Sequence, residues 1–370
     1  MSKKIVHITC VHPPFDSRIF HKECKTLARN GYEVKLVAQH DKDEIVDGIQ
    51  ILSISKPRNR LERMFFSVIE SYRKAVAEKA DLYHFHDPEL IPAGILLKVR
   101  GYRVIYDAHE DVPTQMRIKN WIHPVFKGIF GSMAAAAEWI GSGVFDGVVA
   151  ATPKIATHFP GKKTVVVQNF PQLAESLENA ATPYREREPI LAYTGVVSHL
   201  RGAMEMVEAL GKIPDGQKVQ LQIAGFFSPA DLQSRMQNLS GWSRVVFLGW
   251  QSRPEIAALL GRARIGLVLL HPTKSYLDSY PTKLFEYMAV GIPVITSDFP
   301  LWRKIISEAK CGMVVDPKDP SGIANAISWM LAHEDEAEAM GIRGRRAVLE
   351  RYNWESEARK LLSISEKLTG

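Results

Sequence analysis

Short apolar runs alternate with amphipathic helical periods along most of the chain, as expected of repeated strand–helix units. The runs are continuously apolar rather than alternating, which indicates parallel sheets covered by helices on both faces. In the first half, the predicted strands are residues 5–11, 32–38, 49–54, 81–86, 102–107, 147–151 and 164–168. A helix over residues 18–30 follows the first strand, and we expect it to end at Gly31 because glycine adopts the left-handed conformation at low cost.

The alternation of strands and helices is interrupted between residues 169 and 189, where prolines and charged residues occur without an apolar period, as in an inter-domain linker. It resumes with strands at 190–194, 218–224, 244–248, 265–270 and 293–296 and helices at 201–210, 229–238, 253–261 and 282–290. The chain from residue 319 is helical, and we expect residues 353–370 to pack back on the first domain. The sequence therefore predicts an α/β protein with two doubly wound, Rossmann-like domains, residues 1–168 and 190–352, facing each other across a cleft.

Composition narrows the class of protein. With 46% hydrophobic and 24% charged residues, the 370-residue chain is neither disordered nor fibrous. No apolar run approaches the ~18 residues of a membrane-spanning helix, no secretion signal is recognised, and the three cysteines form no CxxC pair. We therefore expect a cytoplasmic protein without a disulfide framework or a structural zinc site.

The net charge of +6 lies entirely in residues 1–170, which carry 24 Lys and Arg against 18 Asp and Glu. An anionic substrate, an anionic membrane surface and scattered solvated lysines all fit this excess. Nucleic acid is not expected, because the basic residues are not interleaved with stacking aromatic residues on a recognisable module.

Polar residues at the ends of predicted strands are the candidates for chemistry, since ligands of parallel sheets bind there. The first strand leads to His12, Asp16 and Arg18 rather than to a GxGxxG dinucleotide motif. Asp16 is also suited to cap the following helix. Arg18 opposes the helix dipole, so we expect an anion or a carboxylate beside it.

Two further strand ends carry histidines. His84 and His86 point to the same face of their strand, but no third ligand follows at a fixed spacing, so we expect no metal. Asp87 precedes a proline and is suited to cap the next helix. After the next strand, Asp107, His109, Glu110 and Asp111 are too polar for a core, and we expect at least one of them in a binding cleft while others cap the next segment.

In the second half, Gly195 and Arg201 stand where a strand leads into a helix, an arrangement that can bind phosphate. Farther on, Pro281 opens a helix on which Lys283 and Glu286 share one face. A carboxylate can accept two hydrogen bonds from a cis-diol, and a lysine at a helix start suits a diphosphate. A surface ion pair between Lys283 and Glu286 is the alternative.

Four segments together resemble one family of enzymes. Residues 16–34, 81–87, 104–110 and, most specifically, 281–293 are similar to the retaining glycosyltransferases of family 4, also called group 1, which have the GT-B fold. The last segment resembles the branch that builds capsular and other surface polysaccharides. The resemblance covers nearly the whole chain.

The resemblance implies roles for individual residues. Glu286 would bind the ribose hydroxyls of a nucleotide-sugar, Arg201 and Lys283 its phosphates, Gly195 would face the diphosphate, and His109 would lie near the transferred sugar. His109 and Glu286 are thus the expected catalytic residues. The other expected donor-side residues are Gly249, Trp250, Asp278, Pro281 and Thr282, and the acceptor side comprises His12, Asp16, Arg18, His86, Asp87 and Glu110.

Two departures from the family pattern stand out. Asp278 replaces the first of two glutamates, and Val196 stands where the family has an arginine.

The function expected on these grounds is transfer of a sugar, with retention, from a nucleotide diphosphate-sugar to a glycan or lipid-linked acceptor in surface-polysaccharide synthesis. Protein cations would stabilise the leaving diphosphate, so neither a metal nor a cofactor is expected. A sugar-nucleotide epimerase and a non-catalytic nucleotide-sugar-binding subunit remain alternatives. Residues 117–130 mix cations with bulky apolar side chains, which fits contact with the inner face of the cell membrane or a helix flanking the cleft.

Overall fold

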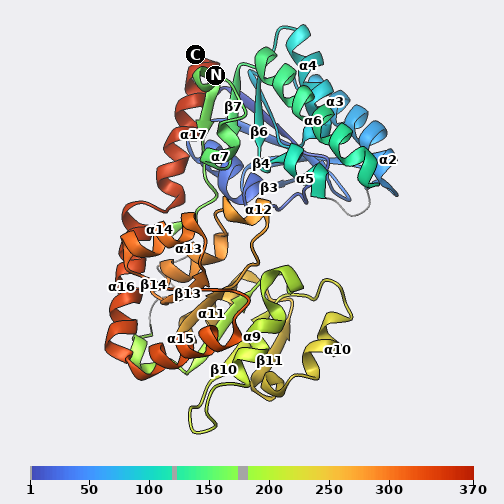
Figure 1. The fold of residues 1–370 in the computed structure, drawn as a ribbon. Coiled ribbons are helices and arrows are strands. Elements are labelled where there is room, and N and C mark those ends of the chain that lie inside the picture. The colour runs from blue at the N-terminus through green and yellow to red at the C-terminus, as the bar shows by residue number, and fades with distance from the viewer. Residues whose placement is uncertain (1, 119–122, 174–181) are drawn as a thin grey trace. The chain divides into compact units, whose positions relative to one another are not determined.

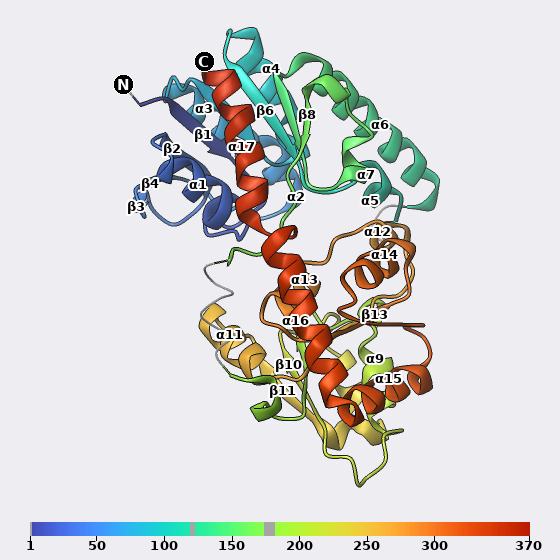
Figure 2. The same ribbon diagram turned by 90° about the vertical axis from the view of Figure 1, so that its left-hand side faces the viewer.

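The computed structural model describes residues 2–118, 123–173 and 182–370, which form two compact units, each built around a parallel or mostly parallel sheet (Figures 1 and 2). Unit 1 comprises Met1–Asn169 with Trp354–Gly370, and unit 2 comprises Phe170–Asn353. Phe170 and Tyr184 are buried in the core of unit 2. The described part of the predicted linker beyond Asn169 therefore packs with unit 2, and residues 174–181 of that linker lie outside the described residues.

The sheet of unit 1 has the strand order β3-β4-β2-β1-β5-β6-β7-β8, and its strands are parallel except for the β3–β4 pair. The strands are β1 Lys4–Ile8, β2 Glu33–Gln39, β3 Glu44–Val46, β4 Ile49–Ile54, β5 Leu82–Phe85, β6 Arg103–Ala108, β7 Gly147–Ala150 and β8 Thr164–Val166. Strand β3 was not predicted, because it is a short edge strand with Ile45 exposed and has no apolar run to mark it.

Helices cover both faces of this sheet, with α3, α4 and α6 on one and α1 and α17 on the other (Figures 1 and 2). The α-helices are α1 Lys25–Arg29, α2 Arg60–Glu62, α3 Val68–Ala77, α4 Ile91–Val99, α5 Val112–Ile118, α6 Pro124–Val144, α7 Pro153–Ala156 and α17 Trp354–Thr369; Ile19–Cys24 and Arg63–Ser67 are π-helical, and Pro88–Leu90 and Gly161–Lys163 are 3₁₀-helical. The predicted helix over residues 18–30 thus begins as a π-helix, in which Glu23 N bonds to Arg18 O five residues earlier, and it ends before Gly31 at φ +87° as expected.

The C-terminal helix belongs to unit 1, although it follows unit 2 in the chain (Figure 2). At its start, the Trp354 indole nitrogen donates to Thr26 Oγ1 at 2.9 Å. One turn later, Gln168 N donates to Glu357 Oε2 at 2.9 Å. The prediction that the end of the chain packs on the first domain is confirmed.

Unit 2 contains an all-parallel sheet of order β11-β10-β9-β12-β13-β14. Its strands are β9 Ile190–Thr194, β10 Gln220–Ala224, β11 Val245–Gly249, β12 Ile265–Val268, β13 Val294–Ser297 and β14 Gly312–Val315. Its α-helices are α9 Ala203–Leu210, α10 Leu232–Gln237, α11 Arg253–Arg262, α12 Lys274–Leu277, α13 Thr282–Ala289, α14 Pro300–Ala309, α15 Pro320–Ala332 and α16 Glu334–Glu350, with 3₁₀-helices at Tyr184–Glu186, His199–Arg201 and Ser240–Arg244. The sequence missed β14, an edge strand of four half-buried residues.

Candidate functional site

A glycine-lined loop follows β9 in unit 2. Gly195 has φ +103°, and its N–H donates to Ala224 O at 2.7 Å. Gly225, at the end of β10, lies so close that a Cβ there would collide with the Gly195 carbonyl. Only glycine lets the two backbones approach in this way, so the carboxyl ends of β9 and β10 present bare backbone.

Two cationic side chains converge on Gly195. A methyl group built on Gly195 would lie 3.8 Å from Lys283 Nζ and 3.9 Å from Arg201 Nη1. Lys283 Nζ is buried, forms no hydrogen bond, and lies 3.7 Å from the centre of the Tyr193 ring. Burial and the neighbouring Arg201 lower the pKa of Lys283 to about 7, while Glu286 acts in the opposite direction. Two basic groups held together in this way can attract an anion.

Helix α13 positions Lys283. Leu284, Phe285 and Met288 are buried in the core of unit 2, as the sequence predicts. The Tyr287 hydroxyl accepts a hydrogen bond from Thr194 N at 3.0 Å and thereby ties the helix to the end of β9. Because Lys283 is buried, the alternative of a solvated surface ion pair does not hold for it.

The other predicted donor-side residues are more exposed. Pro281 immediately precedes α13, and Thr282, its first residue, is exposed. Asp278 is exposed at the end of α12. Gly249 has φ +70° at the end of β11, and the Trp250 side chain is 75% exposed.

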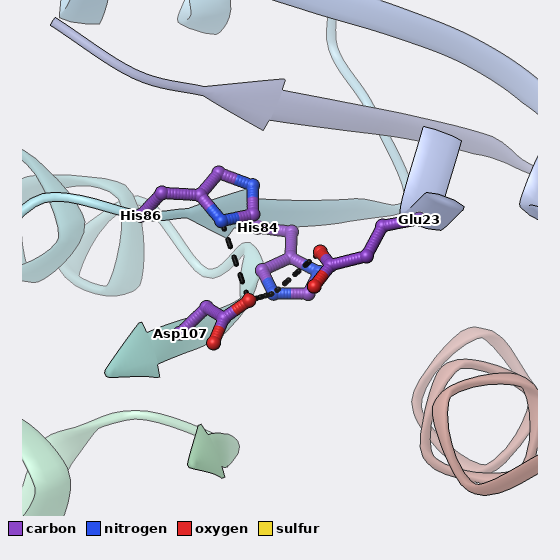
Figure 3. Close-up of side chains that lie close together, drawn as sticks. All are labelled: Glu23, His84, His86 and Asp107. Carbon is purple, nitrogen blue, oxygen red and sulfur yellow. Dashed lines mark ion pairs between the residues drawn. The ribbon is translucent and has the colours of Figure 1, made fainter. Parts of the chain in front are cut away.

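In unit 1, a cluster of histidines and carboxylates lies where β1, β5 and β6 run side by side. We call His7, Glu23, His84, His86 and Asp107 the histidine cluster; Figure 3 shows all but His7. Each member is buried, with at most 2% exposure. His7 of β1 pairs in register with His84 of β5, and His84 and His86 stack with ring centres 4.8 Å apart, on one face as predicted. The expectation that the acids after residue 106 are too polar for a core is wrong for Asp107, because other buried side chains neutralise and bond it.

Arg18 is the cation nearest to these carboxylates. Its Nη2 donates to Asp107 Oδ1 at 3.0 Å, and its Nε lies 2.9 Å from Glu23 Oε1. The prediction that Arg18 has a carboxylate beside it is confirmed. Burial alone would raise the pKa of Asp107, but Arg18 and His109 outweigh it and hold that pKa well below its usual range. Asp107 is therefore an ionised carboxylate inside the fold.

The imidazoles form a chain. His7 Nδ1 lies 2.9 Å from His86 Nε2, and His86 Nδ1 lies 3.1 Å from His109 Nε2. The same nitrogen of His109 is 3.1 Å from Asp107 Oδ2. Burial, and after it the neighbouring imidazoles, lower the pKa of His7 well below its ordinary value. His109, with a side chain 13% exposed, is the end of this chain that reaches solvent.

Asp87 does not cap the next helix as predicted. Its Oδ2 instead accepts hydrogen bonds from Thr9 Oγ1, Cys10 N and Val11 N, at 2.8, 2.6 and 3.1 Å. Three donors from the β1 loop outcompete the helix start, because they enclose a buried carboxylate. The partly exposed His12 ring lies 3.5 Å from Asp87 Oδ1.

The remaining acceptor-side candidates have local roles in the structure. Asp16 Oδ1 accepts from Arg18 N at 2.8 Å and from Ile19 N at 2.9 Å, so the predicted cap is present. Glu110 is exposed and accepts a hydrogen bond from the Gln115 side chain.

Sequence reasoning missed three site residues. His7 interrupts an apolar strand, which is a signal for a buried polar contact. Glu23 lies within an amphipathic helix, where a glutamate is ordinarily solvated. Tyr287 lies on the apolar face of α13, and nothing in its spacing distinguishes its hydroxyl contact from core packing.

Two family models match the chain, one over each half. Residues 17–170 match the model "Glycosyltransferase Family 4", and residues 175–347 match "Glycosyl transferases group 1". The MMP alpha-(1->4)-mannosyltransferase of Mycolicibacterium hassiacum is 21% identical over 321 residues, which are 81% of this chain and 74% of the relative.

Solved structures show the same fold. Sucrose-phosphate synthase from Thermosynechococcus elongatus has a TM-score of 0.76 at 20% identity, with 99% of each chain covered. Anabaena HepE, solved with UDP-glucose, has a TM-score of 0.74 at 12% identity and covers 98% of this chain and 99% of its own. With both halves matched and the GT-B architecture present, the chain belongs to the group 1 glycosyltransferases of family 4.

Proposed function

We propose that this glycosyltransferase moves a hexosyl group, with retention, from a nucleoside diphosphate-sugar to a glycan or lipid-linked acceptor in surface-polysaccharide synthesis. The observation that carries the proposal is the pair of cations over Gly195, where Lys283 Nζ is buried without a hydrogen bond. A buried ammonium group in this state is costly unless an anion binds beside it. A diphosphate supplies such an anion, and HepE, with the same fold, was solved with UDP-glucose.

Negative charge develops on the leaving diphosphate during transfer, and the site must stabilise that charge. Lys283, Arg201 and the start of α13 would stabilise it, so the transfer step itself needs no metal or cofactor. Glu286, one turn after Lys283 on α13, would accept hydrogen bonds from the ribose hydroxyls. Retention of anomeric configuration rests on the family resemblance.

His109 is the proposed contact with the transferred sugar. It is partly exposed at the end of β6, and its Nε2 lies 3.1 Å from both Asp107 Oδ2 and His86 Nδ1. These two buried side chains hold the ring in place. A ring fixed in this way can keep one orientation toward a sugar hydroxyl, as transfer requires.

Donor binding is the first test. We expect one nucleoside diphosphate among UDP, GDP and ADP to bind selectively in calorimetry, and Glu286→Ala to weaken binding at least tenfold, because a hydrogen bond to a charged group contributes about 1.5–3 kcal/mol. Glu336→Ala, at an exposed position on α16, is the matched control and should bind like the wild type. Absence of binding by any nucleoside diphosphate would contradict the proposal.

Turnover separates the transferase from its alternatives. With the matching sugar nucleotide and a lipid-linked acceptor, we expect nucleoside diphosphate release that depends on the acceptor and a loss of 10²- to 10⁴-fold in kcat for His109→Ala. Conversion of the sugar nucleotide into an isomer without release would indicate an epimerase, and binding without any turnover would indicate a binding subunit.

We also propose that unit 1 contacts an anionic membrane through α6, where the acceptor would be presented. The outer face of α6 is apolar at three- and four-residue spacing, with Phe126, Ile129, Phe130 and Met133 46–60% exposed, and it continues to Trp139 at 71%. So large an apolar face on one helix is typical of an interaction site. No helix in the described residues combines the length and apolarity needed to span a bilayer. Residues 119–122 of the predicted interfacial segment lie outside the described residues.

Vesicle flotation tests this contact. The wild type should float with vesicles containing phosphatidylglycerol and not with neutral ones, and Phe126→Asp combined with Trp139→Asp should abolish flotation. Ile342→Asp, on α16 of unit 2, replaces an equally exposed apolar residue and should leave it unchanged. Flotation that persists in the α6 variant would refute the assignment of α6.

A further inference from the structure

The histidine cluster holds more ligand atoms than its hydrogen bonds use. Neither carboxylate oxygen of Glu23 accepts a hydrogen bond, although Oε1 forms the ion pair with Arg18, and neither ring nitrogen of His84 has a hydrogen-bond partner. Both side chains are fully buried. Buried polar atoms are nearly always satisfied in folded proteins, so such a group indicates a missing water or ion.

The spacing of these atoms favours an ion over a water molecule. His86 Nδ1 and His84 Nε2 lie 3.4 and 3.7 Å from Asp107 Oδ2, and His84 Nε2 lies 4.0 Å from a Glu23 oxygen (Figure 3). One ligand atom from each of these four residues lies within 4.8 Å of all the others. With metal–ligand bonds of about 2.1 Å, neighbouring ligands of a tetrahedral ion are about 3.4 Å apart, and opposite ligands of an octahedral ion about 4.2 Å. The separations of 3.4, 3.7 and 4.0 Å lie within this range, and the widest pair of the cluster must close up slightly when an ion binds.

The chemistry of the unpartnered atoms favours a metal ion at the same place. Arg18 is the cation paired with both carboxyl groups, Glu23 and Asp107. It offers nothing to the imidazole nitrogens of His84. A metal ion bonds to both kinds of atom, whereas another ammonium or guanidinium group would serve only the carboxylates.

We propose that Glu23, His84, His86 and Asp107 bind a divalent transition-metal ion of the zinc or iron kind. Two imidazoles with two carboxylates form a donor set that such ions accept. Around the ion, His86 Nε2 would keep its contact with His7, and Arg18 would continue to hold Asp107, as outer residues do around bound metals. His86 Nδ1 would exchange its contact with His109 Nε2 for the bond to the metal, and His109 would keep its contact with Asp107 Oδ2. The sequence showed only the His84–His86 pair, since the other two ligands come from a separate helix and a separate strand.

Metal content of the full chain tests the proposal, independently of the transferase reaction. Chelator-treated protein is incubated with excess Zn²⁺, desalted and analysed by mass spectrometry; we expect about one ion per chain. Glu23→Gln and His84→Gln should each reduce that content at least tenfold at equal protein concentration. His158→Gln is the matched control, since His158 is an exposed histidine of unit 1 outside the cluster.

Cobalt provides a second readout that needs no variant. Co²⁺ added to the metal-free wild type should give visible absorption bands of a protein-bound ion, together with strongly shifted imidazole proton signals in the NMR spectrum. These signals keep the test decisive if a buried substitution prevents folding. A wild type that retains no Zn²⁺ and gives only the spectrum of aqueous Co²⁺ would overturn the proposal, as would one ion per chain that both cluster variants retain.

Discussion

Replacing Lys283 by methionine should make the protein more stable and yet unable to bind its donor. Methionine has nearly the length of lysine and is apolar, so it can occupy the same buried position beside Tyr193. The substitution removes a charge that the fold keeps out of water without a hydrogen bond. Donor binding loses a charged contact worth about 1.5–3 kcal/mol, which is at least a tenfold loss of affinity.

The size of the stability effect follows from the titration of the amine. Folding lowers the pKa of Lys283 from 10.5 to about 7. At about 1.4 kcal/mol per pKa unit, this corresponds to about 5 kcal/mol against folding at a pH where the amine is charged in both states. The methionine variant should therefore gain up to about 5 kcal/mol in free energy of unfolding near pH 6.

The gain must depend on pH in one direction. Between about pH 7 and pH 10.5 the unfolded chain binds a proton at Lys283 that the folded chain has released, so wild-type stability rises with pH relative to the variant. The difference between the two proteins should shrink to about 2 kcal/mol at pH 9 and nearly vanish at pH 10.5. Donor affinity of the wild type should decline over the same range, as the amine loses the charge that holds the diphosphate.

Urea unfolding of both proteins from pH 6 to pH 10, with calorimetry of the selected nucleoside diphosphate, measures both effects. Lys212→Met, at an exposed lysine after α9, should change neither stability nor binding. A variant that is no more stable than the wild type at pH 6, or a gain that stays constant up to pH 10, would refute the reasoning.

Three further substitutions test single contacts. Trp354→Ala removes a buried indole and its bond to Thr26, so urea unfolding should show a loss of about 3–5 kcal/mol, whereas Trp354→Phe should lose less. Tyr287→Phe leaves the buried N–H of Thr194 without an acceptor and should cost about 1–3 kcal/mol in free energy of unfolding, with weaker donor binding in calorimetry. Gly225→Ala places a methyl group against the carbonyl of the β9 loop, so we expect a lower melting temperature and lost donor binding; a variant that binds normally would contradict the close approach.

Apolar pattern predicted the central strands well, because both faces of a parallel strand are buried and the run is then continuous. Strand β9 has the predicted bounds, residues 190–194. Edge strands β3 and β14 were not predicted, whereas edge strands β8 and β11 were, because a strand with a neighbour on one side can but need not carry a continuous apolar run. The π-helical turns of Ile19–Cys24 were also not predicted, because a π-helix, whose hydrogen bonds span one residue more than those of an α-helix, has no distinctive composition.

Residues on one short segment could be predicted as a group, and residues from distant segments could not. The spacing of Lys283 on its helix and the glycine at position 195 were readable locally, although their convergence was not. His84 and His86 were recognised as a pair on one strand face, whereas Glu23 joins them only through the π-helix. The assignment of roles in unit 2 therefore depended on the family resemblance, and spacing alone would have left a surface ion pair as the better interpretation.

At the carboxyl ends of both sheets, some buried polar groups lack hydrogen-bond partners. The sign of the charge on such a group predicts the charge of its ligand. Asp146, elsewhere in unit 1, accepts from Lys98 Nζ, Arg103 Nη1 and Val104 N at 2.8–3.0 Å, so its charge is fully used within the fold and implies nothing more. Lys283 has no such bonds, and an apolar residue there would stabilise the chain. A polar group kept at that cost is explained by a partner of opposite charge, and for the amine of unit 2 we propose a diphosphate. The unbonded carboxyl oxygens and imidazole nitrogens of the histidine cluster are in turn the observation that favours the metal ion proposed there.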